Sequence, residues 1–411
     1  MATIRPFQCV RPKGDVVHRV AALPYDVYNR QEAKAEVQRE PLSFLKIDRA
    51  ETSFDDSVDT YAPEVYQKAK DLLQKDIRDG IYERDTDTAY YVYELVMEGR
   101  SQTGLAACAA VDDYVNNVIK KHENTREDKE IDRITHVDTC SAQTGPIFLA
   151  YRSDQTINEI VAKVQETEPL YDFTAVDGVA HRVWKISNSD DVKKIENAFE
   201  GIGQIYIADG HHRAASAVKV GLKRRKENPQ HTGAEEYNYF LSVLFPHDQL
   251  MIMDYNRTVK DLGGLSKEEF FAKVQENFRM EEQAQPVKPD AKGTFGMYID
   301  RQWYKLTAKP ELFEGKDAVG SLDVSVLQDY LLGPVLGIGD PRTDKRIDFV
   351  GGIRGLAELE KRADEDMTVS FSMYPTSITE LFDVADQNLL MPPKSTWFEP
   401  KLRSGLFIHE I

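Results

Sequence analysis

The amino-acid sequence predicts a mixed α+β protein built from two lobes. The chain has 411 residues, which is too many for one ordinary hydrophobic core. Strand-like and helix-like segments alternate between residues 180 and 226, which is typical of an α/β lobe. A second mixture of short strands and helices follows the polar stretch KENPQHTGAEEY. We therefore expect an α/β lobe over residues 1–230 and an α+β lobe over residues 231–411.

The first hundred residues contain signals for two helices and a hairpin. An amphipathic pattern begins after Asn29, which is a suitable helix cap. Residues 61–79 have apolar side chains at helical spacing, with Pro63 near the start and Gly80 at the end. The runs AYYVYELVM and GRSQTGLAACAAVDDY predict two strands joined by a polar turn. The charged connection that follows them predicts a surface or site segment, which ends in the short strand PIFLAY.

The same kinds of sequence pattern predict the remaining strands and helices. RVWKI and QIYIA predict strands, with a helix over residues 189–200 between them and another after the sequence DGHHR. NYFLSVLFP, LMIMDYNR, TFGMYI and WYKL predict strands of the second lobe, while SKEEFFAKVQENF and DVSVLQDYLL predict helices. The chain closes with a helix, a proline-rich segment and a short strand.

Charge and cysteine usage restrict the class of protein. The formal net charge of −17 argues against a surface that grips DNA, RNA or an anionic membrane. Three cysteines without a CxxC spacing imply neither a disulfide framework nor a zinc knuckle. No window approaches the ~18 apolar residues of a membrane span. We expect a cytoplasmic protein with small-molecule partners.

The sequence IYIADGHHRAASAVKVGL contains the strongest functional signal, because it predicts a strand, a tight turn and a helix. The N-terminus of a helix attracts anions through its free N–H groups and its dipole. Gly210 allows close approach of the backbone, Arg213 matches phosphate oxygens, and His211 and His212 add ring donors. Asp209 adds a carboxylate for a metal or a proton. The alternative is that Asp209 only caps the helix and the histidines pack or face solvent.

Two further segments have residue types that suit phosphate chemistry. KHENT supplies Lys121, Glu123, Asn124 and Thr125 from one polar turn, although a solvated charged loop is the alternative. In MPPKSTWFEPK, residues 394–396 resemble the end of a phosphate-binding loop, but the GxxxxGK spacing is absent. The alternative is a proline-rich strap that packs two aromatic side chains.

The residues of this last phosphate-binding candidate are Lys394, Ser395 and Thr396, and the aromatic side chains beside them are Trp397 and Phe398. Tyr25 and Asp26 of LPYDV are candidates for binding the substrate, although a Pro-Tyr-Asp sequence also forms ordinary turns. We expect the C-terminal segment to return to the DGHHR site.

These motifs also carry a resemblance. LPYDV, KHENT, PIFLAY, IADGHHRAASA and MPPKSTWFEPKLRSGL, in this order, resemble a large, mainly bacterial family catalogued as a domain of unknown function. The DGHHR part is similar to the signature of free serine kinases built on the ParB/sulfiredoxin-like nucleotide-binding fold. This resemblance implies a ParB/sulfiredoxin-like lobe, a role in serine metabolism and phosphoryl transfer from ATP or ADP to free L-serine.

The resemblance also implies roles for particular residues. Residues 210–213 match the phosphate-binding turn, and Asp209 matches a position near the serine hydroxyl. The catalytic base of these kinases is an acid from an earlier segment, for which Glu123 is the first choice and Asp26 the second. Arg213, Lys394 and the helix N-terminus would neutralise the transferred group, and Mg²⁺ would bridge phosphate oxygens.

Two other functions use the same residues. A nucleotide-binding regulator without turnover would need the DGHHR turn but no general base. A Mg²⁺-dependent phosphohydrolase would use water as the acceptor and would release phosphate without an amino acid.

Overall fold

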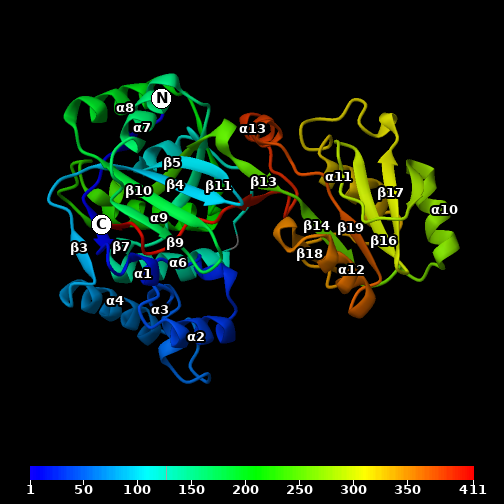
Figure 1. The fold of residues 1–411 in the computed structure, drawn as a ribbon, viewed down its shortest axis with the longest axis horizontal. Coiled ribbons are helices and arrows are strands. Elements are labelled where there is room, and N and C mark those ends of the chain that lie inside the picture. Colours follow the sequence, from blue (N-terminus) through cyan, green and yellow to red (C-terminus); the bar gives the residue numbers. More distant parts are fainter. Residues whose placement is uncertain (126) are drawn as a thin grey trace. The chain divides into compact units, whose positions relative to one another are not determined.

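The computed structural model describes residues 1–125 and 127–411, which form two compact units (Figure 1). Unit 1 contains Met1–Leu250 and Pro400–Ile411, and unit 2 contains Met251–Glu399. The second unit is therefore an insertion into the first. The mixed α+β class is confirmed. The boundary lies at residue 250 instead of the expected 230, because the strand Tyr239–Pro246 pairs with strands of unit 1 on both sides.

Unit 1 is organised around a nine-stranded mixed sheet. The strand order is β6-β11-β8-β12-β5-β4-β10-β9, and β1 pairs with β5. Two neighbouring pairs are parallel, β6 with β11 and β8 with β12. The strands are β1 (Ile4–Arg5), β4 (Tyr90–Met97), β5 (Arg100–Ala110), β6 (Ile119–Lys120), β8 (Ile147–Tyr151), β9 (Tyr171–Thr174), β10 (Ala180–Ile186), β11 (Ile205–Asp209) and β12 (Tyr239–Pro246).

The core of this sheet follows from its apolar strands. The central strands are buried almost throughout, which is why their sequences read as continuous runs of apolar residues. Ile205 and Ile207 of β11 belong to the same buried cluster as Ala214 and Val218 of the helix that follows. Helices α7 (Gln155–Gln165) and α8 (Ser189–Gly201) lie together on one side of the unit in Figure 1. The helix α9 (His211–Glu227) leaves directly from the end of β11.

A smaller region of unit 1 joins the two ends of the chain. Its sheet has the order β3-β2-β21-β7, so the C-terminal strand lies between strands from the first half of the chain. The helix cap expected at Asn29 is present as a capping box with Glu32, and it begins α2. The elements are β2 (Cys9–Pro12), β3 (Tyr82–Arg84), β7 (Ala142–Gln143), β21 (Ile408–Glu410), α1 (Val17–Val20), α2 (Arg30–Arg39), α3 (Leu45–Asp48) and α4 (Pro63–Arg78). Helix α5 (Val111–Val115) follows β5 and packs with the core of the main sheet.

Several helices were not expected from the sequence, and the longest of them carries the residues that follow KHENT. Residues after KHENT form α6 (Glu127–Cys140), where the charged pattern had predicted a surface connection. The reason is that several of its polar side chains are buried, among them Glu130, Arg133 and His136, so no apolar stripe marks its inner face. None of the described helices is long and apolar enough to cross a membrane.

Unit 2 is built on a six-stranded antiparallel sheet with the order β15-β17-β16-β19-β14-β18. The two chain segments that enter and leave the unit pair with each other as β13 and β20. The strands are β13 (Met251–Met253), β14 (Tyr255–Val259), β15 (Phe278–Gln283), β16 (Thr294–Ile299), β17 (Gln302–Ala308), β18 (Ile347–Gly351), β19 (Val369–Ser372) and β20 (Trp397–Glu399). The α-helices are α10 (Lys267–Asn277), α11 (Asp323–Leu327), α12 (Leu356–Glu365) and α13 (Ile378–Asp386).

Candidate functional site

Two parallel strands of unit 1 bring the KHENT and DGHHR segments together. β6 pairs with β11 through Ile119 opposite Ile205 and Lys120 opposite Tyr206. Because neighbouring parallel strands point their carboxyl ends at the same edge, the segments that follow them meet there. The ring centroids of His122 and His211 are 4.4 Å apart at an interplanar angle of 88°. KHENT and DGHHR therefore form one cluster.

Glu123 is the acid of KHENT that lies beside this turn. One of its carboxylate oxygens, Oε2, is 3.8 Å from Nδ1 of His211. The Glu123 side chain is 45% exposed, whereas that of His211 is 5% exposed. An acid at the edge of a buried imidazole can therefore be reached by a ligand from solvent.

The DGHHR turn has the backbone geometry of an anion cradle. Gly210 is the N-cap of the 17-residue helix α9 and has φ 92°, a conformation that favours glycine. Gly210 has no side chain with which to cap the helix, and Asp209, the last residue of β11, precedes the N-cap. A Cβ atom at position 210 would lie 3.0 Å from Nε of Arg213, because the guanidinium folds back over the glycine. The first turn of α9 thus presents main-chain N–H groups beside a cation.

Asp209 is held between two cations. Its Oδ2 atom is 3.2 Å from Nη2 of Arg213 and 3.9 Å from Nζ of Lys401. Burial favours the protonated acid, but Lys401 and Arg213 outweigh it and hold the pKa of Asp209 below its ordinary value. Arg213 also donates from Nη1 to the carbonyl oxygen of Pro146, at 2.6 Å. Asp209 is therefore ionised at neutral pH.

The two buried histidines of the cluster are neutral. Burial lowers the pKa of His122 to about 4, and burial together with His122, His212 and Lys121 lowers the pKa of His211 well below its ordinary value. His122 is 3% exposed. Among the described residues, Nδ1 of His122 and Nε2 of His211 have no hydrogen-bond partner. His212, the second residue of α9, is less buried than His211.

The remaining KHENT side chains, those of Lys121, Thr125 and Asn124, have different surroundings. Nζ of Lys121 lies 4.5 Å from the ring centroid of Tyr114. The Thr125 hydroxyl donates to Glu130 of α6, which also accepts from Lys219 of α9. Asn124 is exposed. The hydroxyl of Thr125 thus ties the loop to two helices, while Asn124 remains accessible to a ligand.

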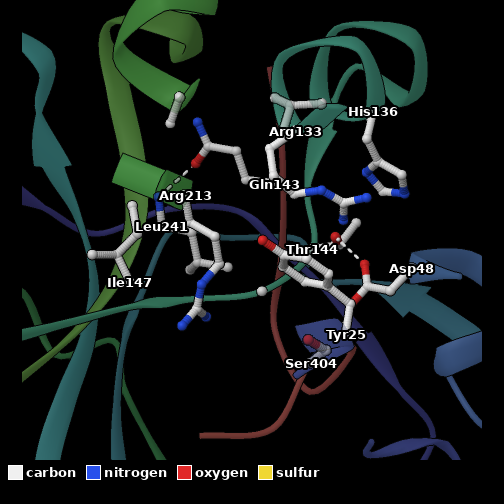
Figure 2. A pocket seen from close by; sticks show the side chains of 13 residues that line it. Tyr25, Asp48, Arg133, His136, Gln143, Thr144, Ile147, Arg213, Leu241 and Ser404 are labelled. Atoms are coloured by element: carbon white, nitrogen blue, oxygen red, sulfur yellow. Dashed lines mark hydrogen bonds between the residues drawn. The ribbon is translucent and has the colours of Figure 1, made fainter. Parts of the chain in front are cut away.

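LPYDV contributes to a small cavity beside Arg213, shown in Figure 2. Tyr25 lies with its ring centroid 4.0 Å from Cζ of Arg133, and burial raises the pKa of its hydroxyl to about 12. The cavity, which Ser404 also lines, has a volume of about 30 Å³. This is the space of about one water molecule, so it does not hold a nucleotide or an amino acid. Asp26 is exposed next to Tyr25.

The MPPKST segment belongs to unit 2, whereas the residues described above belong to unit 1. Lys394 is exposed and has φ 58°, and its carbonyl oxygen accepts from Nη2 of Arg257 at 3.0 Å. Ser395 donates its hydroxyl to the carbonyl of Pro392 at 2.6 Å, and Thr396 is half-buried. The adjoining aromatic residues pack within unit 2: Phe398 is buried, and Trp397 meets Tyr255 edge-on at 4.9 Å.

Two residues of the cluster were missing from the sequence-based set. His122 stands inside the quoted KHENT motif, but nothing in the motif marks it as buried against His211. Lys401 follows Lys394 in the same C-terminal segment, and its signal is the basic run KLR after the last proline. The chain crosses from unit 2 to unit 1 between these two lysines. Within the described residues, no group of three or more His, Cys, Asp or Glu side chains is arranged to hold a metal ion.

Comparisons with known proteins give one family and several distant structures. The family model described as "Protein of unknown function (DUF1015)" matches residues 4–325. No curated protein matches the chain. A free serine kinase in complex with AMP has 14% identity and a TM-score of 0.35, and the match covers 73% of this chain and 91% of that one.

Two further solved structures are equally distant. SbnI from Staphylococcus aureus, with a C-terminal truncation, has 12% identity and a TM-score of 0.38, with 73% of this chain and 85% of that one covered. A conserved hypothetical protein from Pyrococcus furiosus has 14% identity and a TM-score of 0.34, with 73% and 93% covered. Likenesses at these TM-scores carry no argument about activity.

Proposed function

The chain belongs to the DUF1015 family, a family of unknown function, and we propose that it is a kinase for a small hydroxyl metabolite. The donor is ATP or ADP. The first candidate for the acceptor is free L-serine, chosen because the DGHHR motif resembles that of free serine kinases. The single observation that carries the proposal is the parallel pairing of β6 with β11, with Glu123 beside His211 in the first turn of α9.

The nucleotide phosphates suit the turn at residues 210–213. Phosphoryl transfer depends mainly on positioning and on neutralising the charge of the transferred group. The N–H groups of the first turn of α9 are donors for phosphate oxygens, and Gly210 lets the backbone approach them. Arg213 and Lys401 add positive charge around Asp209. His212, Lys121 and Asn124 are the candidates for further donors to the phosphates.

The two acids have different roles in this mechanism. Asp209 is paired with cations, which makes it a poor proton acceptor. Glu123 is more accessible and lies next to a neutral imidazole, so we assign the general base to it. The acceptor oxygen forms a bond to phosphorus while the bond from that phosphorus to the bridging oxygen breaks. The hydroxyl proton passes to Glu123, and ADP leaves from ATP or AMP from ADP.

Asp209, the acid that does not act as the base, is suited to binding a divalent cation. Mg²⁺ is typically bound through one or two carboxylates, with phosphate oxygens and waters completing its shell. Asp209, an ionised carboxylate at the cradle, suits this role without a cage of protein ligands. When bound, the ion would neutralise charge on the phosphates. The substrate hydroxyl would be oriented by Asn124, and Tyr25, Asp26 and residues 394–396 are the remaining candidates for binding contacts.

The test is an incubation of the full chain with Mg²⁺, either ATP or ADP, and a pool of hydroxyl metabolites that includes L-serine, followed by mass spectrometry. We expect a phosphorylated acceptor. Glu123→Gln should lower turnover at least about 100-fold, since a positioned base contributes about 10²–10⁴. Its nucleotide dissociation constant should stay within about threefold, because glutamine keeps the size of the side chain and the base acts on the acceptor.

The other outcomes identify the alternatives. Inorganic phosphate released without an acceptor would assign a phosphohydrolase. Nucleotide binding without turnover, unaffected by Glu123→Gln, would assign a regulator. A large loss with Asp26→Asn and none with Glu123→Gln would move the base to Asp26. No nucleotide binding at all would refute the proposal.

A further inference from the structure

A second and larger cavity of unit 1 lies outside the site described above. It has a volume of about 300 Å³, at the lower end of the range for ligand pockets. Its lining residues come from α1, α2 and the segment between them, from the turn between β9 and β10, and from the C-terminal segment. None of its described lining residues lines the cavity of Figure 2 or belongs to the KHENT and DGHHR segments. This cavity is therefore a separate candidate for binding a small molecule.

Arg403 is the buried cation of this cavity. Its side chain lines the cavity although the residue is only 3% exposed. Nη2 donates to the carboxylate of Asp177, and Nε donates to Nε2 of His181 at 3.1 Å. Burial and the charge of Arg403 lower the pKa of His181 to about 3, so this ring is neutral. Asp177 is therefore the acid that balances the charge of Arg403.

Two hydrogen-bond donors of the cavity are left for a ligand. Within the described residues, Nη1 of Arg403 makes no hydrogen bond, and neither does the hydroxyl of the half-buried Tyr28. Burial raises the pKa of this hydroxyl, so it keeps its proton. A buried donor without a partner costs free energy. A carboxylate can accept from a guanidinium and a hydroxyl together, which would satisfy both donors.

Two acids line the same cavity, Glu36 from α2 and Glu40 from the end of this helix. Glu36 pairs with Arg39 through both carboxylate oxygens, and Glu40 pairs with Arg19 in the same way. An ionised carboxylate has about four lone-pair sites, so each of these acids can accept a further hydrogen bond. The cavity therefore offers acceptors for an ammonium group as well as donors for a carboxylate.

The charges around the cavity favour a ligand without net charge. Three arginines line it, and each is paired with one acid; the pairs are Arg19 with Glu40, Arg39 with Glu36, and Arg403 with Asp177. The positive and negative charges of these pairs cancel. A dianion such as phosphate would add uncompensated charge, whereas a zwitterion would not. His18 also lines the cavity, but it is exposed to solvent, which screens its charge.

We propose that this cavity binds a free α-amino acid. The carboxylate accepts from Nη1 of Arg403 and from the Tyr28 hydroxyl, while the ammonium donates to Glu36 or Glu40. This ligand satisfies the two donors and leaves the charge of the cavity unchanged. The inference goes beyond the proposed function, because the site shares no lining residue with the phosphate-binding turn and needs no catalysis.

The rest of the lining restricts the side chain of the ligand. Its apolar residues are Ala21, Ala22, Leu23, Ala175 and Val176. Apolar walls in a cavity of this volume leave room for a short side chain and offer no partner for a second charge. We therefore expect small, uncharged amino acids to bind more tightly than large or charged ones.

The first experiment is thermal unfolding of the full chain without nucleotide. Each standard L-amino acid is added in turn at about 10 mM, because a ligand that binds the folded state raises the unfolding temperature. The amino acid with the largest effect is then titrated by calorimetry. The 2-hydroxy acid with the same side chain lacks the ammonium and should bind at least about tenfold more weakly. Inorganic phosphate should also bind more weakly than the amino acid.

Substitutions then locate the bound amino acid. Arg403→Met should weaken its binding at least about tenfold, because a contact between charged groups is lost. Tyr28→Phe removes one hydroxyl and should weaken binding about threefold, which gives a milder variant if Arg403→Met does not fold. Arg84→Met, which changes an exposed arginine of unit 1 outside the cavity, is the matched control. Glu123→Gln should leave the affinity within about twofold, because Glu123 does not line the cavity.

The results can overturn the inference in three ways. No amino acid raises the unfolding temperature of the full chain. Phosphate or the 2-hydroxy acid binds as tightly as the amino acid, so that no ammonium is recognised. Glu123→Gln abolishes binding while Arg403→Met and Tyr28→Phe keep it, which would place the amino acid at the acceptor position of the proposed kinase. A full chain that binds the amino acid through Arg403 but has no kinase activity would refute the proposed function alone.

Discussion

At the scale of single residues, the site contains two acids whose surroundings differ. Asp209 has Arg213 and Lys401 within ion-pair distance of one carboxylate oxygen. One carboxylate oxygen of Glu123 lies 3.8 Å from Nδ1 of the neutral His211 ring, and its side chain is 45% exposed. Divergent environments of neighbouring acids are a common way of dividing roles between a charged group and a proton acceptor. The division of roles proposed here follows from the two cations at Asp209 and the exposure of Glu123, and not from the residue types.

Substituting each of two lysines in turn can identify the one that contacts the nucleotide. Lys401→Met should weaken nucleotide binding about tenfold, since a contact with a charged group contributes about 1.5–3 kcal/mol. Lys394→Met is the matched comparison, because it removes the lysine that the sequence motif favours. Isothermal titration calorimetry with ADP measures both. Equal affinity of Lys401→Met and the parent, with a loss in Lys394→Met, would move the cation to the MPPKST segment.

The residue types of the site could be predicted from the sequence, but their partners could not. The local sequence predicted the strand-turn-helix junction at DGHHR, but the residue discussed as a helix cap was Asp209 and not Gly210. The contact of His122 with His211 depends on strand pairing between segments 89 residues apart, which leaves no local pattern. The sequence-based roles of individual residues stay predictions, to be tested by the substitutions above.

At the scale of elements, many of the long strands and amphipathic helices were predicted, whereas the short strand β6 and the charged helix α6 were not. β4, β5, β11, α2 and α4 have apolar periodicity or caps, and all are present near the expected residues. β6 has only two residues, so its pairing with β11 has no signal in composition. Helix α6 was missed because its buried face contains ion pairs and hydrogen bonds instead of an apolar stripe, as Arg133 with Asp132 illustrates.

The C-terminal segment depends on one glycine of unit 1. Gly405 has φ 76°, and a Cβ atom there would lie 2.3 Å from Cγ of the buried Phe44. Gly405→Ala should therefore destabilise unit 1 by about 3 kcal/mol or more, because backbone strain and overpacking add. Gly99 has φ 78° with open space around it, so Gly99→Ala should cost only about 1 kcal/mol. Urea unfolding followed by circular dichroism compares them, and equal losses would contradict the clash with Phe44.

At the scale of the whole molecule, the sequence predicted two lobes but not their connection. A division at residue 230 assumes that each lobe is one continuous segment. The chain instead leaves unit 1 after Leu250 and returns at Pro400. Composition could not reveal this, because Pro400–Ile411 joins unit 1 through long-range pairing, with β21 between β2 and β7. The part of the C-terminal segment that returns to unit 1 therefore contains Lys401.

The insertion can be removed to ask whether unit 1 is the nucleotide-binding part. Met251 pairs with Glu399 across an antiparallel ladder, where opposite Cα atoms are about 5 Å apart. A two- to four-residue Gly-Ser turn can therefore replace residues 252–398 without strain. The shortened chain should fold, because its sheet and both ends of the chain lie in unit 1.

The dissociation constant of this shortened protein for ADP should lie within about threefold of that of the full chain, because the DGHHR turn, Glu123 and Lys401 all remain. The loss of one contact would instead weaken binding about tenfold. Thermal unfolding checks that it folds, and calorimetry measures its affinity. A folded shortened protein that binds ADP more than about tenfold more weakly would show that unit 2, with Lys394–Thr396, supplies part of the nucleotide site. Comparing the shortened protein with Lys394→Met in the full chain then distinguishes that segment from the rest of unit 2. The two proteins would lose the same affinity for ADP only if Lys394 accounts for the effect.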